Sequence, residues 1–391
     1  MVLPDNGIVF SIFLIFAGSA VLATLALVAR QAMIVAYILL GVVLGPWGLA
    51  LVDDAAWIND VSDIGMMFLL YLLGLNLMPS RLVRSFKRAV GVTCVSSAIF
   101  LSSGFFIAIA FSFNFESALL IGTIMMFSST IIGLKLLPTT TLHHKHTGEV
   151  IISVLLLQDL VAIIVLIVLQ GVGGIGELWL DVARGLGALP ALILVAYLAE
   201  RYMIEPLITR YHQIPEYIFL LVIAWCLGVA ELAYRMHLSH AIGAFIAGVS
   251  LASCPIAPFI ADRLRPLRDF FLVLFFFSLG AKFNLAIVGE IFYPAATLAT
   301  AMLVLKPFVF RQLLVYTGEK RVVATEIGVR LGQGSEFALL IAVLALGLDL
   351  IDGVVANVIQ FAILLTFVVS TYLVVLQYPT PIATTDRLRR D

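Results

Sequence analysis

Residues 322–346 read VVATEIGVRLGQGSEFALLIAVLAL, an apolar stretch long enough to cross a lipid bilayer. Its centre is interrupted by the polar run Gly332-Gln333-Gly334-Ser335-Glu336. Two glycines in this run let the backbone leave the helical conformation at little cost. The stretch therefore predicts two half-helices joined by an unwound segment in the middle of the membrane. Interrupted helices of this kind expose backbone carbonyls and half-helix dipoles, which can coordinate cations.

The composition of the whole chain is that of an integral membrane protein. Of its 391 residues, 62% are hydrophobic and 12% are charged, whereas soluble domains are about 25% charged. The net charge of −1 argues against a nucleic-acid partner. The three cysteines, Cys94, Cys226 and Cys254, have neither zinc-site nor disulfide-framework spacing. No basic region precedes the first apolar run, so no cleaved signal peptide is expected.

Apolar runs bounded by charges, proline and glycine predict an all-α protein with thirteen transmembrane helices. Their ranges are 7–29, 32–50, 63–78, 89–111, 116–137, 149–170, 185–204, 215–234, 237–253, 268–282, 289–316, 322–346 and 353–376. With the N-terminus outside, the outer connections contain only Arg184, Arg235 and Lys282, and most other basic residues fall inside. The positive-inside rule therefore predicts an N-out, C-in topology. The acidic segment 52–63 is expected to be an outer loop.

Polar groups in four of these helices are predicted to lie at one depth. Asp159 is ten residues into a helix that begins near Glu149, which places it about 15 Å deep, at the middle of a roughly 30 Å hydrocarbon core. Lys306 lies ten residues before the inner end of its helix near Tyr316. A second polar run, residues 127–130, reads Phe-Ser-Ser-Thr at matching depth. A charge at this depth is costly, so these groups predict one shared site.

The direction of the helices predicts inverted repeats. The fifth and twelfth predicted helices run in opposite directions, as do the fourth and eleventh and the sixth and thirteenth. These triplets are candidates for inverted-topology repeats, each with an interrupted central helix that crosses the other. The chain is predicted to be a single transmembrane domain, residues 1–391, with a core bundle at about 89–170 and 289–376. The scaffold is expected at about 7–78 and 185–282.

Residues 155–162, LLLQDLVA, resemble the Gln-Asp helix motif of Kef-type potassium/proton antiporters in the monovalent cation/proton antiporter-2 family. The resemblance extends in order over essentially the whole chain. The similar segments are 36–38, 45–49, 74–77, 128–130, 240–248, 275–280, Lys306 and 333–337. Asn76 departs from the glutamate usual in the family, and Arg330 has no counterpart. The regulatory nucleotide-binding domain common in Kef systems is not expected here, which leaves regulation by a separate subunit open.

The resemblance implies an NhaA-like antiporter fold in a multi-pass protein of the cell inner membrane. It implies a homodimer in membrane lipid that exchanges potassium for protons by an alternating-access, elevator mechanism. It implies no enzymatic activity, no cofactor and no metal beyond the transported cation. Three alternatives stay open: a sodium/proton antiporter of the same fold, a cation-coupled solute carrier and an ion channel. An intramembrane hydrolase is disfavoured because no Gly-x-Ser-x-Gly or His-Glu-x-x-His motif occurs.

Three residues carry the predicted exchange chemistry. Asp159 can hold a cation as a carboxylate or a proton as an acid, so one site couples two fluxes by competition; a structural pairing is the alternative. The neutral amide of Gln158 leaves a single titratable acid, which predicts electroneutral exchange, although it could also be a spacer. Lys306 is expected to offset the negative ends of the half-helices, or else to pair with Asp159 directly.

The two polar runs complete the predicted cation and proton site. Ser128, Ser129 and Thr130 are expected to line it through oxygen atoms, or to bond back to helix carbonyls. Gln333, Gly334 and Ser335 belong to the second interruption, and Glu336 is expected to be structural, as is the pair Glu326–Arg330. The inner loop His143–His146 is expected to be solvated, with metal binding or pH sensing as alternatives.

Overall fold

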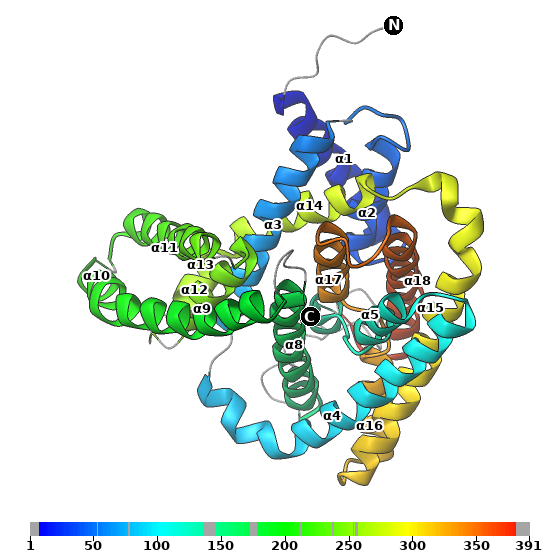
Figure 1. The fold of residues 1–391 in the computed structure, drawn as a ribbon. Coiled ribbons are helices and arrows are strands. Elements are labelled where there is room, and N and C mark those ends of the chain that lie inside the picture. The colour runs from blue at the N-terminus through cyan, green and yellow to red at the C-terminus, as the bar shows by residue number, and fades with distance from the viewer. Residues whose placement is uncertain are drawn as a thin grey trace, which may run out of the picture. The chain divides into compact units, whose positions relative to one another are not determined.

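The computed structural model describes residues 8–52, 54–76, 79–135, 146–172, 178–211, 213–236, 238–252, 254 and 257–380. Within these residues the regular elements are helices and no strand occurs, which confirms the predicted all-α class (Figure 1). The α-helices are α1 (Ile8–Val28), α2 (Met33–Leu44), α3 (Ala55–Asn76), α4 (Pro79–Ala110), α5 (Phe115–Met125), α6 (Thr130–Lys135), α8 (His146–Val172), α9 (Leu178–Ala199), α10 (Glu205–Tyr211), α11 (Pro215–Arg235), α12 (His240–Ala252), α13 (Ala257–Arg263), α14 (Arg265–Ala281), α15 (Val288–Tyr316), α16 (Arg321–Arg330), α17 (Glu336–Gly347) and α18 (Gly353–Gln377). A π-helical turn, Glu200–Ile204, joins α9 to α10.

Every predicted helical range overlaps at least one observed helix. The fifth range is split into α5 and α6, and the twelfth into α16 and α17, so both predicted interruptions are present. Six described helical segments are long and apolar enough to cross a membrane by themselves, namely 8–28, 89–110, 147–166, 215–235, 285–316 and 353–377. The chain is therefore a multi-pass membrane protein. The count of thirteen crossings, their orientation and the inverted repeats stay predictions.

Several predicted boundaries are wrong, and three of them have a clear local reason. The expected outer loop at 52–63 is helical from Ala55, because Asp54 accepts a hydrogen bond from the Trp57 backbone N–H (3.1 Å) and so caps α3. Helix α4 begins at Pro79 rather than near residue 89, since proline suits the first turn of a helix. Helix α2 ends at Leu44 rather than at residue 50, at the extended backbone of Gly45.

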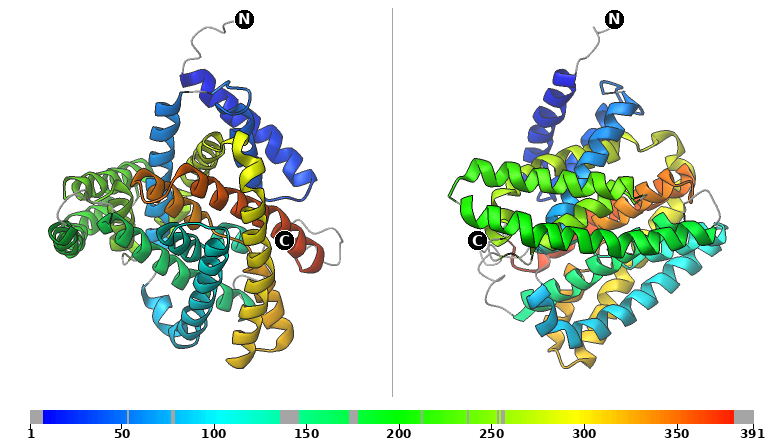
Figure 2. Two further views of the ribbon diagram at one scale, coloured as in Figure 1. Left: turned by 45° about the vertical axis from the view of Figure 1, so that its right-hand side comes forward. Right: turned by 60° about the vertical axis from the view of Figure 1, so that its left-hand side comes forward.

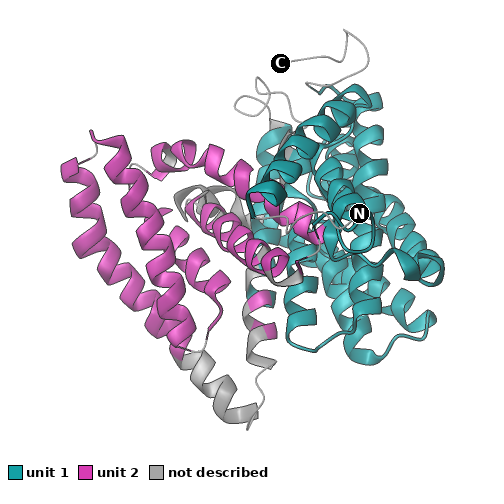
Figure 3. Cartoon of the chain, turned by 90° about the horizontal axis from the view of Figure 1, so that it is seen from above, with its two compact units in different colours: residues 1–52, 84–165, 280–391 teal, residues 53–83, 166–279 magenta. Residues whose placement is uncertain are grey.

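The chain divides into two compact units (Figure 3). Unit 1 comprises residues 1–52, 84–165 and 280–391, and unit 2 comprises residues 53–83 and 166–279. Both interrupted helices, most of α8, and α15 and α18 belong to unit 1. Every residue of the predicted cation and proton site therefore lies in one unit.

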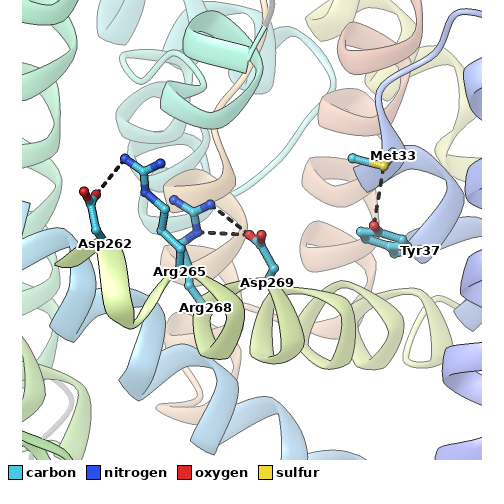
Figure 4. A network of polar contacts seen from close by, with 6 residues as sticks. All are labelled: Met33, Tyr37, Asp262, Arg265, Arg268 and Asp269. Carbon is cyan, nitrogen blue, oxygen red and sulfur yellow. Dashed lines mark hydrogen bonds and ion pairs between the residues drawn. The ribbon is translucent and has the colours of Figure 1, made fainter. Parts of the chain in front are cut away.

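In unit 1, α15 packs against α16 and α18, and α17 packs against α5 and α18 (Figures 1 and 2). Glycines allow the closest approaches. A Cβ atom on Gly328 of α16 would lie 2.6 Å from the Pro307 carbonyl oxygen of α15. A Cβ atom on Gly122 of α5 would lie 2.5 Å from the Leu101 carbonyl oxygen of α4. These crossings hold the half-helices α5 and α16 against continuous helices. The short polar contact between Tyr37 and Met33, 3.8 Å, lies within α2 of this unit (Figure 4).

Unit 2 contains α3, α9–α13 and nearly all of α14. A Cβ atom on Gly74 of α3 would lie 2.5 Å from the Phe245 carbonyl oxygen of α12, so these two helices are in backbone contact. The rings of Phe68 and Phe271 stack with centroids 4.4 Å apart. The ion pairs of this unit shown in Figure 4, Arg265 with Asp262 and Arg268 with Asp269, are short (2.8 Å each) and solvent-accessible. Surface pairs of this kind contribute little stability.

Candidate functional site

The first interruption separates α5, which ends at Met125, from α6, which begins at Thr130. The side-chain amide of Gln158 in α8 holds this unwound segment at two points. Its Oε1 accepts a hydrogen bond from the Ser128 backbone N–H (3.1 Å), and its Nε2 donates one to the Met126 carbonyl (2.9 Å). The amide thus replaces helical partners that the unwound backbone has lost, because buried peptide groups require hydrogen bonds. Ser129 accepts a hydrogen bond from the Ile132 N–H (3.0 Å) and so caps α6.

The second interruption spans residues 331–335, between α16 and α17. Ser335 is the N-cap of α17, and its hydroxyl accepts a hydrogen bond from the Phe337 N–H (3.0 Å). The Gly334 N–H donates to the Thr366 hydroxyl of α18 (2.9 Å). A Cβ atom on Gly334 would lie 3.0 Å from Ile363 Cγ1, so a larger residue would press on α18 here.

Lys306 of α15 joins the two interruptions. Its side chain is 0% exposed. Its Nζ donates to the carbonyl oxygens of Phe127 (2.5 Å) and Gln333 (3.1 Å), and to the Ser128 hydroxyl (3.4 Å). Both α5 and α16 end at an interruption, so each directs the negative end of its dipole there. A buried ammonium group between these two ends offsets both partial charges.

Two further hydrogen bonds connect the interruptions directly. The Ser128 hydroxyl donates to the Leu331 carbonyl (2.8 Å). The Gln333 side-chain Nε2 donates to the Ser129 carbonyl (3.5 Å). The predicted convergence of these segments at one place is therefore what the fold produces, although the residues are far apart in sequence.

Asp159 lies next to Gln158 on α8 and is 2% exposed. The Thr130 hydroxyl is shared between its two carboxylate oxygens, at 3.3 Å from Oδ1 and 3.1 Å from Oδ2. Within the described residues no ion pair joins Asp159 to Lys306, so the predicted alternative of a direct pair is absent from this conformation. The charge of Glu336, which is buried in the first turn of α17, repels that of Asp159.

Most of the predicted site residues thus fall into two groups, whereas Gly334 bonds to α18 and Ser335 caps α17. Gln158, Ser128, Ser129, Lys306 and Gln333 form one hydrogen-bonded network around the interruptions. Asp159 and Thr130 contact each other beside it. Two further predictions lie outside the described part of the chain, the loop residues 143–145 and the side chain of Asn76. In the described residues no group of three or more His, Cys, Asp or Glu side chains could hold a metal ion.

Two residues that contact the site were missed at the sequence level. Thr366 and Ser370 of α18 both bond to the second interruption, Thr366 to the Gly334 N–H and Ser370 to the Gln333 Oε1 (2.9 Å). Their spacing of four residues on a largely apolar helix puts both hydroxyls on one face. This spacing is the sequence signal that points to Thr366 and Ser370. It is a weak signal, because hydroxyls in apolar helices commonly bond back to their own helix.

Arg330, which has no counterpart in the resemblance, is the last residue of α16 and is 2% exposed. Its guanidinium bonds to Glu326 Oε1 (3.0 Å) and to the Pro379 carbonyl (2.9 Å), and it lies 5.6 Å from the centre of the Tyr378 ring. The expected pair Glu326–Arg330 is therefore present. It anchors the end of α16, directly before the second interruption, to the backbone that follows α18.

We expect Glu326→Ala to lower the free energy of unfolding in detergent by about 3–5 kcal/mol, since it leaves a buried guanidinium without its carboxylate. Glu231→Ala is the matched control, because its partner Arg235 is also four residues later but both side chains are largely exposed. The control is expected to change stability by about 0.5 kcal/mol or less. Thermal unfolding measures the stability of both variants. If the two variants lost the same amount of stability, the Glu326–Arg330 pair would contribute no more than an exposed surface pair.

Comparison with known proteins gives a consistent picture. The profile of the family described as "Sodium/hydrogen exchanger, transmembrane" matches residues 13–376. The glutathione-regulated potassium-efflux system protein KefC of Cronobacter sakazakii is 30% identical over 378 residues, which cover 93% of this chain and 59% of KefC. The iron transporter MagA of Paramagnetospirillum magneticum is 26% identical over 344 residues, covering 88% of this chain and 79% of MagA. These similarities confirm the resemblance to Kef-type proteins.

The fold also has a solved counterpart. The sodium proton antiporter MjNhaP1 from Methanocaldococcus jannaschii superimposes with a TM-score of 0.72 over 93% of this chain and 95% of that one, at 16% sequence identity. This identity is low, so the match shows the fold and nothing of the transported ion. The chain spans 59% of the length of the KefC relatives.

Proposed function

Since this chain belongs to the family of transmembrane sodium/hydrogen exchangers, we propose that it exchanges a monovalent cation for a proton, with Asp159 binding the two alternately. One observation carries the proposal. Among the described residues, the buried carboxylate of Asp159 has the Thr130 hydroxyl as its donor and no basic partner. A buried carboxylate in such surroundings needs a proton or a cation to offset its charge. The proton and the cation compete for the same oxygens, and that competition couples their movement.

The neighbours of Asp159 support this role. Glu336 lies at the N-terminus of α17, where the helix dipole stabilises its negative charge. A negative charge there would raise the energy of a bare Asp159 carboxylate by repulsion, which favours the proton-bound and cation-bound states. Lys306 is engaged with backbone carbonyls rather than with Asp159. The carboxylate thus stays available to its transported ligands.

The exchange is proposed to be electroneutral, with one cation for one proton. Gln158 is neutral, and its amide is already bonded on both sides to the unwound backbone. It therefore positions the first interruption rather than binding a proton itself. With Asp159 as the one exchanging acid, the site carries the same charge in both directions of transport.

Potassium is the proposed cation, with sodium as the alternative within the same fold. The proposal rests on the name of KefC, a potassium-efflux system protein, to which this chain is 30% identical. The polar groups around Asp159 and the interruptions are hydroxyls, amides and carbonyls, whose oxygens suit hard monovalent cations.

The movement is proposed to be an elevator motion in a homodimer of the cell inner membrane. The core bundle would carry both interruptions, Asp159 and Lys306 as one body, since their hydrogen bonds join α5, α8, α15 and α16. Because these helices would move together, the groups that coordinate the cation would keep their positions relative to one another. Only the side of the membrane from which the cation reaches them would change. The scaffold of residues 7–78 and 185–282 would face lipid and the second subunit.

Purified protein in proteoliposomes, with internal pH read by a dye, tests the proposal. An outward or inward gradient of potassium should drive proton movement in the opposite direction without an imposed voltage. Sodium and choline gradients serve as comparisons for selectivity. Cation flux without proton movement would instead identify a channel.

We expect Gln158→Asp to lower the maximal exchange rate by about tenfold or more, because a carboxylate cannot donate to the Met126 carbonyl and buried unpaired groups cost about 1–3 kcal/mol. The residual exchange should depend on an imposed membrane potential, since a second acid can carry an extra proton. Rates at fixed ion gradients and varied potential measure this. A wild-type protein whose own rate responds to the potential would contradict one-for-one exchange.

A further inference from the structure

Helix α18 presents two buried hydroxyls to the second interruption. Thr366 and Ser370 are 0% and 1% exposed and lie one helical turn apart. Thr366 donates its own proton to the Ile363 carbonyl (2.7 Å), so its oxygen is left to accept the Gly334 N–H. The hydrogen bond at Thr366 therefore has a fixed direction, from the interruption to α18.

Ser370 and the Ser129 carbonyl together hold the Gln333 side-chain amide. The Ser370 hydroxyl donates to Gln333 Oε1 (2.9 Å), so the Nε2 of the same amide faces the other way, towards the Ser129 carbonyl. The result is a continuous chain of hydrogen bonds from α18, through Gln333, to the first interruption. If the amide turned over, its contact with the Ser129 carbonyl would be lost, because the Gln333 Oε1 and that carbonyl are both acceptors.

We propose that α18 forms a third wall of the ion site, and that Thr366 and Ser370 are positioning residues that set the spacing of the two interruptions and hence the affinity for the transported cation. This inference rests on the proposed function. Gly334 packs directly on α18, where a Cβ atom would lie 3.0 Å from Ile363 Cγ1, so a side chain would fit only if Ile363 shifted. Residues that hold coordinating groups in place without touching the ion commonly change affinity by about 10–100-fold in metal sites.

Ser370→Ala and Thr366→Val test the proposal in proteoliposomes, measured as apparent KM and maximal rate for potassium. Both variants should raise KM by about fivefold or more, in line with one lost buried hydrogen bond, and leave the maximal rate within about twofold. Thr366→Ser keeps the hydroxyl and should retain the wild-type KM. Thr371→Val is the matched control: Thr371 is equally buried on α18, but its hydroxyl donates to the Phe367 carbonyl of its own helix.

The outcomes separate this inference from the proposed function. An unchanged KM in Ser370→Ala and Thr366→Val, or an equal rise in Thr371→Val, would overturn the role of α18. Potassium-dependent thermal stabilisation in detergent gives a second readout that needs no transport. If wild type is stabilised by potassium but exchanges no protons, the proposed function fails. In that case the role of α18 is tested by the potassium concentration that gives half-maximal thermal stabilisation. The proposal expects this concentration to be higher in the two variants than in the wild type. If potassium neither stabilises nor is exchanged, both fail.

Discussion

Asp159→Asn is expected to reduce cation-driven proton movement by about a hundredfold or more, a loss of at least about 2.7 kcal/mol of transition-state stabilisation. The asparagine amide neither takes up a proton near neutral pH nor neutralises a cation. Its Oδ1 can still accept the Thr130 hydroxyl, which is the contact that the wild-type carboxylate makes. Folding and membrane insertion should therefore be retained, and the defect should be one of exchange alone.

The measurement is proton release on addition of potassium to proteoliposomes that contain equal amounts of protein. Asp262→Asn provides the control, since Asp262 is an exposed partner of Arg265 in unit 2. It should exchange at the wild-type rate. Near-normal exchange in Asp159→Asn would show that Asp159 is not the exchanging acid, and Glu336 would be the next acid to test.

Lys306→Met should have the second-largest effect, because it removes the donor that two interruptions share. The carbonyl oxygens of Phe127 and Gln333 would each lose a buried hydrogen bond, with a combined loss of about 2–6 kcal/mol in the free energy of unfolding. The negative ends of α5 and α16 would also face each other without a counter-charge. We expect exchange to fall by at least about tenfold, together with a lower unfolding temperature in detergent.

Lys306→Arg keeps the charge but not the shape, because a guanidinium is a planar fork and not a compact ammonium. It should restore part of the stability and little of the transport. Lys320→Met, at an exposed position just before α16, is the matched removal of a lysine from unit 1. A Lys306→Met protein with normal exchange and stability would refute the shared-donor role.

Some of the site could be predicted because it depends on local sequence. The two interruptions occur where predicted, since glycine and short polar side chains weaken a helix wherever they stand. Counting residues along each helix predicts that Asp159 and Lys306 lie at mid-membrane depth, and the structure shows that both side chains are buried. The start of α3 differs from the prediction for an equally local reason: Asp54, within the segment 52–63, caps the helix by accepting a hydrogen bond from the Trp57 N–H.

Other features could not be predicted because they depend on partners far away in the chain. Sequence left open whether Lys306 pairs with Asp159 or with carbonyls, and the fold places the Phe127 carbonyl, 179 residues away, within 2.5 Å of its Nζ. The role of Gln158 as a clamp on residues 126–128, and the contacts of Thr366 and Ser370, likewise appear only after packing.

The sequence alone determined that this is an all-helical membrane protein, that two of its helices are interrupted, and which of its apolar segments contain ionisable residues. Composition, apolar run length and helix-weakening residues decide these properties one segment at a time. Only the tertiary structure decided which polar atoms satisfy which others around the interruptions. Unwound backbone can bond to any donor or acceptor that the fold brings near, and partners such as Ser128 and Leu331, 203 residues apart, are chosen by the packing of whole helices.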